Sequence, residues 1–366
     1  MRVLICGGGV IGAACAYYLS VRGVDVVLIE KAAIACAASG KSGGFLAEDW
    51  CDGTPLETLA RRSFALHASL EQILRADYGY RRLEAFAGRL SLADYREFPQ
   101  DGASWLSGRL RLTGQLSTTH TSAQVHPGDF TSALMQAAIS HRAKLHRGEV
   151  SGLIIEERTS RITGVVVDGE TLNGDAVIIA MGPWSKLPRQ WLPLPRVRGL
   201  KGHSLVLRTG DSIPPQALFL ECREADGRMT SPEVFPRADG TTYVCAISSE
   251  TPVPPDPAAV IPDAGAIDRL KAICAAISPI LAKAPVLAEQ ACFRPVVADG
   301  LPLIGAVPNI GGAYVATGHS VWGILNAPAT GEAMAELLTT GKTGVVDLEA
   351  FNPDRFGMRS TARSTV

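Results

Sequence analysis

The sequence predicts an α/β protein in which a mostly parallel sheet, built from both ends of the chain, is interrupted by an antiparallel sheet. Two observations support this fold class. Strands and helices alternate at both ends of the chain, which is typical of a parallel sheet covered by helices. Residues 202–250 lie between those ends and are strand-like, with the runs Leu205–Leu207 and Tyr243–Ala246, and they indicate the antiparallel part.

The first 30 residues form the clearest unit. Residues 1–6 indicate a short buried strand that leads into the run 7–12, and a helix to Arg22 and a second strand, 24–29, follow it. This is G-x-G-x-x-G in the context that it requires, with an acid, Glu30, 18 positions after the last glycine. The free N–H groups at the start of the helix can face phosphates. The unit therefore predicts a Rossmann-type dinucleotide site.

Each glycine of the motif has its own expected role. Gly7 allows the tight turn, Gly9 lets the backbone approach a pyrophosphate, and Gly12 lets the helix pack closely on the strand. Glu30 can accept hydrogen bonds from a ribose hydroxyl, which argues against a cofactor with a 2′-phosphate.

Composition excludes several classes of protein. The chain has 366 residues, a formal net charge of −1 and a pI near 6.7, so nothing favours nucleic acid or an anionic membrane as a partner. Glycines interrupt the uncharged stretch Val3–Val21, so we expect neither a secretory signal nor a membrane span there. The eight cysteines contain no C-x-x-C pair and no Cys/His cluster, so we expect no metal site and a cytoplasmic location.

Capping residues predict where the other helices begin and end. Thr54–Glu57 is a capping box with proline at the first helical position. This helix should end near Gly79. Asp129 should cap a helix to about Arg142, and Asp263 one to about Ile277. Asn326 should cap the last helix, Ala327–Thr340. Runs at 153–155, 162–167 and 176–180 indicate a small β-excursion that returns to a buried parallel strand.

Four further segments contain the glycines and polar residues expected around a bound cofactor. Ser39–Gly44 is a turn whose N–H groups and hydroxyls suit a pyrophosphate or a polyol chain. Ala180–Ser185 ends the returning strand with a glycine, Gly182, where the backbone can pass close to a ligand. Arg294-Pro295 precedes the run Asp299–Gly305, and the last segment is Ala316–Gly331. Any one of these glycines could belong to a plain turn, but five segments in this order argue against that interpretation.

Together, the five segments resemble the glycine/D-amino-acid oxidase superfamily of FAD enzymes, which includes glycine oxidase and monomeric sarcosine oxidase. The match covers nearly the whole chain in the same order. We expect a discontinuous FAD-binding domain made of residues 1–50, 126–200 and 290–366, and a substrate-binding domain made of residues 51–125 and 201–289.

The resemblance implies that the first unit holds the ADP part of FAD, that Ser39–Gly44 lines the pyrophosphate and flavin edge, that Val150 touches the adenine end, and that the loop 318–325 lies against the isoalloxazine ring. The full set implied to bind FAD is Gly7, Gly9, Val10, Ile11, Gly12, Glu30, Lys31, Ser39, Lys41, Ser42, Gly43, Gly44, Val150, Ala180, Gly182, Trp184, Gly318, His319, Gly323, Ile324 and Leu325. The last helix begins after that loop, so its positive end can stabilise the reduced ring by up to about 2 kcal/mol.

In this superfamily the amine loses a hydride from its α-carbon to flavin N5, the imine hydrolyses, and O₂ is reduced to H₂O₂. The chemistry then needs an anchor for the substrate carboxylate, and Arg294 is the candidate, because a guanidinium binds a carboxylate with two parallel hydrogen bonds. The alternative is a surface arginine in an ion pair, which its apolar neighbours Phe293 and Pro295 argue against.

The chain departs from glycine oxidase at two positions of the implied pocket. Glu233 stands where the resemblance implies a tyrosine, and Val321, with Trp322 beside it, stands where it implies a second arginine. An apolar pocket wall and a carboxylate suggest a larger, N-substituted or cationic amine. A lone glutamate is more often solvated at a strand edge, and this interpretation of Glu233 stays open.

Two further residues have alternative interpretations. Cys292 lies seven positions before Asp299, the offset of the cysteine that carries covalent flavin in monomeric sarcosine oxidase, but a buried structural cysteine with non-covalent FAD is the ordinary case. His319 could be a general base, although its place after Gly318 favours a contribution from its backbone.

The leading functional hypothesis is an FAD-dependent oxidase of an amino acid or N-substituted glycine, with O₂ as acceptor. The alternatives are an FAD-dependent amine dehydrogenase that passes electrons to a quinone or carrier, and a non-catalytic flavoprotein with a trafficking or assembly role. A nicotinamide-dependent dehydrogenase would leave Ser39–Gly44 and Gly318–Leu325 unexplained. The sequence indicates no oligomeric state.

Overall fold

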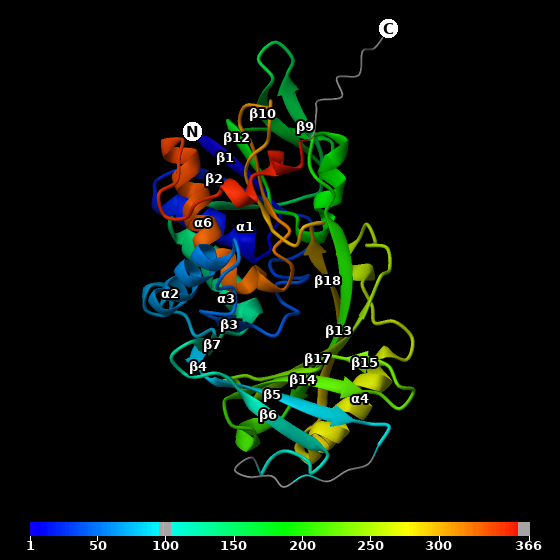
Figure 1. Ribbon diagram of the computed structural model, residues 1–366. Coiled ribbons are helices and arrows are strands. Elements are labelled where there is room, and N and C mark those ends of the chain that lie inside the picture. The colour runs from blue at the N-terminus through cyan, green and yellow to red at the C-terminus, as the bar shows by residue number, and fades with distance from the viewer. Residues whose placement is uncertain (95–97, 99–103, 358–366) are drawn as a thin grey trace.

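The computed structural model describes residues 1–94, 98 and 104–357. Its upper part is a six-stranded sheet in the order β19-β20-β12-β1-β2-β8 (Figure 1). All neighbours in this sheet are parallel except β19 and β20. Its strands are β1 (Arg2–Cys6), β2 (Asp25–Glu30), β8 (Lys144–Arg147), β12 (Ala176–Ile179), β19 (Leu303–Ala306) and β20 (Ala313–Thr317).

Alternate residues of these strands pack into two different hydrophobic clusters. Val3 and Ile5 of β1 face the helices, whereas Leu4 and Cys6 face the opposite layer. Helix α1 (Val10–Val21) packs between α3 (Pro127–Ser140) and α6 (Gly323–Thr340), and α2 (Glu57–Leu74) packs on α6 from outside. The opposite face is covered by a small sheet of β9 (Val150–Glu156), β10 (Arg161–Val167) and β11 (Glu170–Asn173). A sheet covered on both faces has strands with continuous apolar runs, such as Val3–Cys6 in β1.

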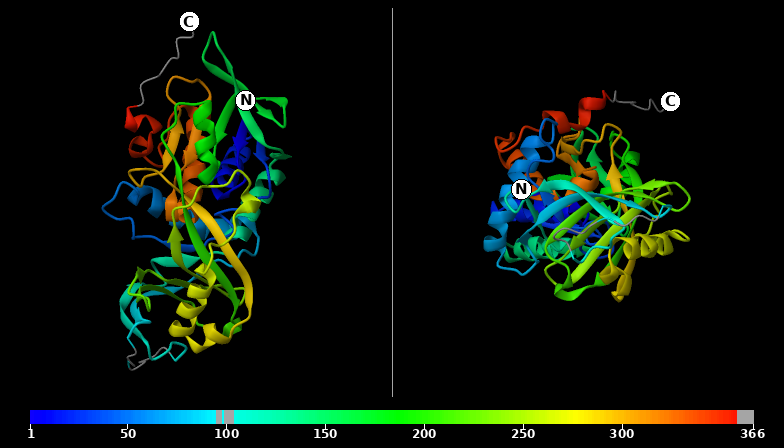
Figure 2. Two further views of the ribbon diagram at one scale, coloured as in Figure 1. Left: turned by 90° about the vertical axis from the view of Figure 1, so that its right-hand side faces the viewer. Right: turned by 60° about the horizontal axis from the view of Figure 1, so that its bottom comes forward.

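The lower part is an eight-stranded sheet with two helices against it, and Figure 2 shows it below the parallel sheet. The strand order is β18-β13-β17-β16-β14-β5-β6, and β15 pairs with β14. The strands are β5 (Glu84–Ser91), β6 (Leu110–Ser117), β13 (Arg198–Arg208), β14 (Gln216–Arg223), β15 (Met229–Thr230), β16 (Glu233–Pro236), β17 (Thr241–Ser249) and β18 (Val286–Val296); the helices are α4 (Ala266–Ile277) and α5 (Pro279–Lys283). Strands β13 and β18 run from this sheet up to the parallel sheet (Figure 1).

Short elements complete the fold. A three-stranded sheet joins β3 (Phe45–Ala47), β7 (Ser122–Gln124) and β4 (Arg81–Arg82). The 3-10 helices are η1 (Gly182–Gln190), η2 (Gly210–Ser212), η3 (Pro257–Ala259), η4 (Ser320–Trp322), η5 (Glu349–Phe351) and η6 (Pro353–Phe356). The predicted fold class, a Rossmann-type parallel sheet with an antiparallel second sheet, is confirmed. The exact domain boundaries stay a prediction, and β13 and β18 each cross one of them.

Two helices differ from their predicted limits, α2 at both ends and α3 at its start. Helix α2 begins at Glu57 and ends at Leu74, well before Gly79, because Arg75 adopts a left-handed conformation (φ 50°). Helix α3 begins at Pro127, and Asp129 lies in its first turn. The cap of α3 is the ring of His126, whose Nδ1 accepts a hydrogen bond from the Asp129 N–H.

The predicted caps of the last two long helices also differ. Helix α4 follows Gly265 (φ 73°), and Asp263 instead forms an ion pair with Lys201. Helix α6 begins at Gly323 rather than Ala327. Asn326 therefore lies inside the helix, fully buried, and among the described residues its amide group has no hydrogen-bond partner. Pro328, which the sequence places in the first turn, lies farther inside the helix because α6 starts earlier.

Candidate active site

One large cavity lies between the parallel sheet and the antiparallel sheet. Its volume is about 910 Å³, at the upper end of the 300–1,000 Å³ that is usual for ligand sites. All five segments singled out in the sequence contribute to its lining. The lining residues fall within 6–11, 29–50, 148–150, 180–187, 202–203, 219–235, 243–248, 255–257, 269, 292–295 and 317–324.

The three motif glycines contact different parts of the protein. A Cβ atom on Gly7 (φ 115°) would lie 2.4 Å from the carbonyl oxygen of Ala180, and one on Gly12 would lie 2.0 Å from that of Gly7. These two glycines allow the strand, turn and helix to pack. Gly7 and Gly9 both line the cavity, but a Cβ atom on Gly9 would meet only the Ser39 hydroxyl, at 3.2 Å. Gly9 is thus the glycine that a cofactor backbone can approach.

Glu30 marks one end of the cavity. Its Oε2 accepts a hydrogen bond from the Gly8 N–H (2.7 Å) and its Oε1 accepts one from the Ala32 N–H (2.8 Å), so the carboxylate is held at the end of β2. Lys31 follows and pairs with Glu149 at 2.9 Å, next to Val150 in the cavity wall. This arrangement suits the ribose and adenine end of a dinucleotide.

The turn Ser39–Gly44 fits a bound polar group. The Ser39 hydroxyl accepts a hydrogen bond from the Val10 N–H at 2.9 Å, at the start of α1. The Ser42 hydroxyl is buried in the cavity wall, and no described residue is its hydrogen-bond partner. A Cβ atom on Gly43 would lie 2.2 Å from the Phe235 ring, so the turn needs glycine there. A buried hydroxyl without a partner is rare in proteins, and an oxygen of a bound pyrophosphate or polyol chain would give the Ser42 hydroxyl its hydrogen bond.

The loop before α6 forms the other end of the cavity, but not all of its residues face inward. Gly318 (φ 82°), Gly323 and Ile324 line the cavity, as do Ala180, Gly182 and Trp184 from the returning strand. His319 and Leu325 point into the core instead. The His319 Nε2 lies 3.1 Å from the Thr330 hydroxyl, and burial lowers the pKa of His319 to about 3. The interpretation of His319 as a general base is therefore wrong, because its ring does not reach the cavity.

Arg294 reaches into the cavity from β18. Its guanidinium crosses the neighbouring strand β13 at Gly202, where a Cβ atom would lie 3.6 Å from Nη2, and it donates to the Ser248 hydroxyl at 2.6 Å. A neutral hydroxyl leaves most of the guanidinium donors available for a carboxylate. The flanking Phe293 side chain is buried.

Glu233 lies on the cavity wall from β16, an interior strand between β14 and β17. The interpretation as a solvated strand-edge residue is therefore wrong. The Cys245 thiol donates to Glu233 Oε2 at 3.4 Å. Burial raises the pKa of Glu233, and the Cys245 hydrogen bond and the positive charge of Arg294 act against that rise. Glu233 and Arg294 both line the cavity, and the positive charge of Arg294 favours the ionised form of Glu233.

Sequence reasoning missed an aromatic wall beside Glu233. Its members, Phe45, Trp50, Phe219, Phe235 and Tyr243, all line the cavity. The Trp50 and Phe219 ring centroids lie 4.6 Å apart, and those of Phe45 and Phe219 lie 5.0 Å apart. They come from the four strands β3, β14, β16 and β17 and from the loop after β3, so no local sequence pattern indicates the wall. Phe219, Phe235 and Tyr243 lie in the strand-like region 202–250, whereas Phe45 and Trp50 lie outside it.

Val321 and Trp322 lie at the rim of the cavity, on η4. Val321 is 53% exposed, so it forms the mouth of the cavity rather than an inner wall. Cys292 lies deeper, with its Sγ 4.0 Å from the Lys41 carbonyl oxygen. Burial raises the pKa of Cys292, which keeps it a thiol rather than a nucleophilic thiolate.

No helix in the part of the chain that the structure describes is long and apolar enough to cross a membrane. Comparison with known proteins identifies the kind of cofactor that this cavity takes. The sequence profile of the DAO family, FAD dependent oxidoreductase, matches residues 2–337. Glycine oxidase from Geobacillus kaustophilus is 28% identical over 96% of this chain and 96% of its own length. Its crystal structure has a TM-score of 0.79 to this one, at 27% identity, over 97% of this chain and 99% of its own.

A putative oxidoreductase from Schizosaccharomyces pombe is 28% identical over 96% of this chain and 98% of its own length. The family match extends over most of the sequence, and both relatives align over nearly their full length. The resemblance inferred from the five segments, the FAD cofactor and the enzymatic nature of the protein are confirmed. The chain belongs to the DAO family of FAD-dependent oxidoreductases.

Proposed function

We propose that the chain is an oxidase of an N-substituted amino acid, with Arg294 as the anchor for the substrate carboxylate. The proposal rests on the presence of Arg294 and Glu233 in the same cavity, close enough to influence each other electrostatically. The other end of this cavity fits a dinucleotide. A zwitterionic substrate with a carboxylate and a substituted ammonium group would meet the opposite charge at each of its ends.

The residues proposed to hold FAD are those of the five segments whose atoms face the cavity. Glu30, Lys31 and Val150 would contact the adenosine, and Gly9, Ser39 and Ser42 the pyrophosphate. The isoalloxazine ring would lie against Gly43, Gly182, Gly318 and Gly323. Gly12, His319 and Leu325 would act only through packing. We propose that FAD is bound without a covalent bond, which the raised pKa of Cys292 supports.

When bound, FAD would supply a two-electron acceptor for the hydride of the substrate α-carbon, and O₂ would take up these two electrons with two protons to give H₂O₂. The residues of the chain position the substrate. The Arg294 guanidinium fixes the carboxylate by two hydrogen bonds and so orients the α-carbon toward the ring. The substrate ammonium group must lose its proton before its lone pair can donate electrons, and the neighbouring Glu233 carboxylate, whose pKa is raised by burial, would accept that proton. Water that enters through the rim at Val321 then hydrolyses the imine product to a keto acid and an amine.

The aromatic wall supports an N-alkyl substituent. Aromatic faces attract alkylated ammonium groups, and a neighbouring carboxylate adds to that attraction. Glu233 and the Phe219 ring lie on adjacent strands at the same register position. An unsubstituted amino acid would leave this wall uncovered, whereas an N-alkyl group would bury apolar surface against it.

The test is reduction of the bound flavin by a substrate panel without oxygen. N-alkyl glycines should bleach the visible flavin spectrum faster than glycine or D-amino acids, and admission of O₂ should restore the colour with one H₂O₂ per cycle. Bleaching that O₂ does not reverse at a useful rate would identify an amine dehydrogenase that uses a quinone or carrier instead. No bleaching by any amine would contradict the proposal. A cytoplasmic location, expected from the cysteine usage, belongs to the same proposal.

A further inference from the structure

Helix α6 contains a break next to the cavity. Pro328 lies inside the helix, and because proline has no backbone N–H, the carbonyl group of Ile324 loses its helical partner. Ile324 and Gly323 form the first turn of α6 and line the cavity. This carbonyl therefore belongs to the first turn of α6, where the N–H groups of a helix have no partner within the helix.

Two buried side chains of α2 contact the backbone groups of α6 that Pro328 leaves without helical partners. The Nε2 atom of His67 lies 3.0 Å from the Ile324 carbonyl oxygen and 3.1 Å from that of Leu325. One turn earlier on α2, the Ser63 hydroxyl accepts a hydrogen bond from the Ala329 N–H at 3.0 Å. Both side chains are completely buried where α2 packs on α6. Together they replace the helical hydrogen bonding that the proline interrupts.

The chemistry of the site determines the protonation state of His67. Two carbonyl oxygens next to Nε2 require that this nitrogen carries the proton and donates it. Burial lowers the pKa of His67 to about 4, so the ring is neutral at neutral pH. Its Nδ1 has no hydrogen-bond partner among the residues that the structure describes. His67 is thus a neutral donor that stands in for the missing N–H of Pro328.

We propose that His67 is a positioning residue that holds the first turn of α6 against the cavity, and that it raises the reduction potential of the bound FAD through this turn. A helix start stabilises negative charge, and the reduced ring carries more negative charge than the oxidised ring. If the Ile324 carbonyl lost its donor, the turn would rotate to seek another partner and its N–H groups would no longer converge. The inference rests on the proposed placement of the ring beside residues 318–324.

The test is the midpoint potential of FAD in the substitution His67→Leu, measured by anaerobic photoreduction against a reference dye. We expect the ratio of reduced to oxidised flavin at a fixed potential to fall about tenfold, which corresponds to about 30 mV for a two-electron couple. His67→Gln, which retains an N–H donor, should recover part of this shift. Because the measurement uses no substrate, it is independent of whether the proposed amine oxidation is correct.

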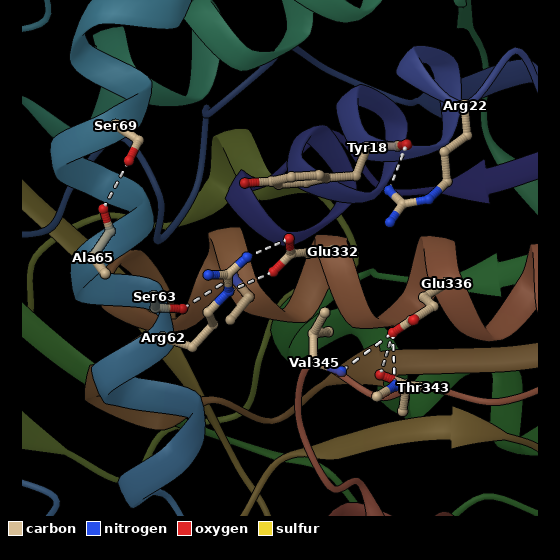
Figure 3. Close-up of polar contacts among 12 residues, drawn as sticks. Tyr18, Arg22, Arg62, Ser63, Ala65, Ser69, Glu332, Glu336, Thr343 and Val345 are labelled. Atoms are coloured by element: carbon tan, nitrogen blue, oxygen red, sulfur yellow. Dashed lines mark hydrogen bonds and ion pairs between the residues drawn. The ribbon is translucent and has the colours of Figure 1, made fainter.

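Arg62→Ala is the matched control. Arg62 also joins α2 to α6, through two hydrogen bonds to Glu332 at 2.7 and 2.8 Å (Figure 3). Glu332 lies farther along α6 than Gly323 and Ile324, which line the cavity. We expect this substitution to lower the melting temperature without changing the potential. If His67→Leu lowers the melting temperature and leaves the potential unchanged, or if Arg62→Ala shifts the potential equally, the role of His67 is structural only and the proposal is wrong.

Pro328→Ala gives an independent test of the mechanism. It restores a backbone N–H for the Ile324 carbonyl, so in this background the substitution His67→Leu should shift the potential much less than it does alone. This background also provides the comparison if His67→Leu alone does not fold. An equal shift in both backgrounds would show that His67 does not act through the Ile324 carbonyl and would overturn the inference.

Discussion

The two ends of the cavity are built in different ways. Around residues 7–12 and 39–44 the shape is decided by backbone, since side chains at Gly7, Gly12 or Gly43 would overlap neighbouring atoms. On the face of the antiparallel sheet the shape is decided by side chains that come from separate strands, as Arg294 and Glu233 do. Substitutions at the first end should therefore remove the cofactor, and substitutions at the second end should keep the cofactor and change the chemistry.

The largest expected effect is the loss of FAD in Gly9→Val. The added side chain would enter the cavity beside the Ser39 hydroxyl, where the pyrophosphate is proposed to lie. The wild type should purify yellow with one FAD per chain, and Gly9→Val should purify colourless and resist reconstitution. The visible spectrum measures both.

The control for Gly9→Val is the thermal stability of the apoprotein, which should change little because a Cβ atom meets no backbone atom within 4 Å at this position. Gly12→Ala should instead lose folded protein, since its Cβ would lie 2.0 Å from the Gly7 carbonyl oxygen. A Gly9→Val protein that retains FAD would show that the cofactor does not approach this turn.

Much of the first end could be predicted from the sequence, because its information is local. Glycines at fixed spacing, followed by a helix, a strand and Glu30, specify one backbone arrangement, and the structure has it. Helix starts were harder to predict. Asn326 is a good capping residue by type, but α6 already begins at Gly323, because hydrogen bonds from α2 allow the helix to pass through Pro328. Such tertiary compensation leaves no trace in the local sequence.

At the second end, the strongest effect is expected for Arg294→Ala. Loss of one partner of a desolvated charge pair should cost about 2–4 kcal/mol of transition-state stabilisation in kcat/KM. Arg294→Lys should recover only part of this, because an ammonium group cannot form the bidentate contact. FAD content should stay at the wild-type level in both variants, as measured by the visible spectrum.

Arg198→Ala is a suitable control for Arg294→Ala, because Arg198 lies on the same sheet in an exposed pair with Glu250 at 3.1 Å. Exposed pairs contribute about 0–1 kcal/mol, so its kcat/KM should hardly change. If Arg294→Ala keeps kcat/KM within about twofold of the wild type for an active amine, the substrate carboxylate is bound elsewhere.

A smaller effect is expected for Glu233→Gln, measured with N,N,N-trimethylglycine as a non-reacting cationic probe. The ionised carboxylate should attract the probe, so the substitution should weaken binding about tenfold, or about 1.4 kcal/mol. Because burial raises the pKa of Glu233, wild-type binding should strengthen as the pH rises through that raised pKa, and Glu233→Gln should not show this pH dependence. The perturbation of the flavin spectrum reports binding.

Glu233→Gln should weaken probe binding but increase the stability of the folded protein. The folded state raises the pKa of Glu233 above its value in the unfolded chain, so folding is opposed once the pH exceeds the unfolded value, and the full penalty applies above the folded value. Glu233→Gln removes this penalty and should raise the melting temperature of the substrate-free protein at neutral pH. If Glu233→Gln is less stable than the wild type at neutral pH and binds the probe equally well, Glu233 does not contact the substrate as proposed.

The position of Glu233 shows why the second end could not be predicted in full. A lone glutamate is solvated in most proteins, and only the pairing of β16 with β14 and β17 places this one inside the sheet beside the cavity. The aromatic wall depends in the same way on contacts such as that of Trp50 with Phe219, which lie far apart in the sequence. Arg294 could be predicted as a candidate from the family resemblance, but its path over Gly202 to Ser248 could not.

The smallest effect is expected at Cys292, which lies between the two ends of the cavity. Burial raises the pKa of its thiol, so the thiolate needed to attack a flavin carbon is scarce at neutral pH. Acid precipitation should therefore release the flavin into the supernatant. Cys292→Ser should leave FAD content and kcat/KM within about twofold of the wild type, since the thiol makes only a 4.0 Å contact with the Lys41 carbonyl oxygen. A yellow pellet that turns colourless in Cys292→Ser would instead show a covalent bond, and the cofactor would then be held by a side chain as well as by the glycine-lined backbone.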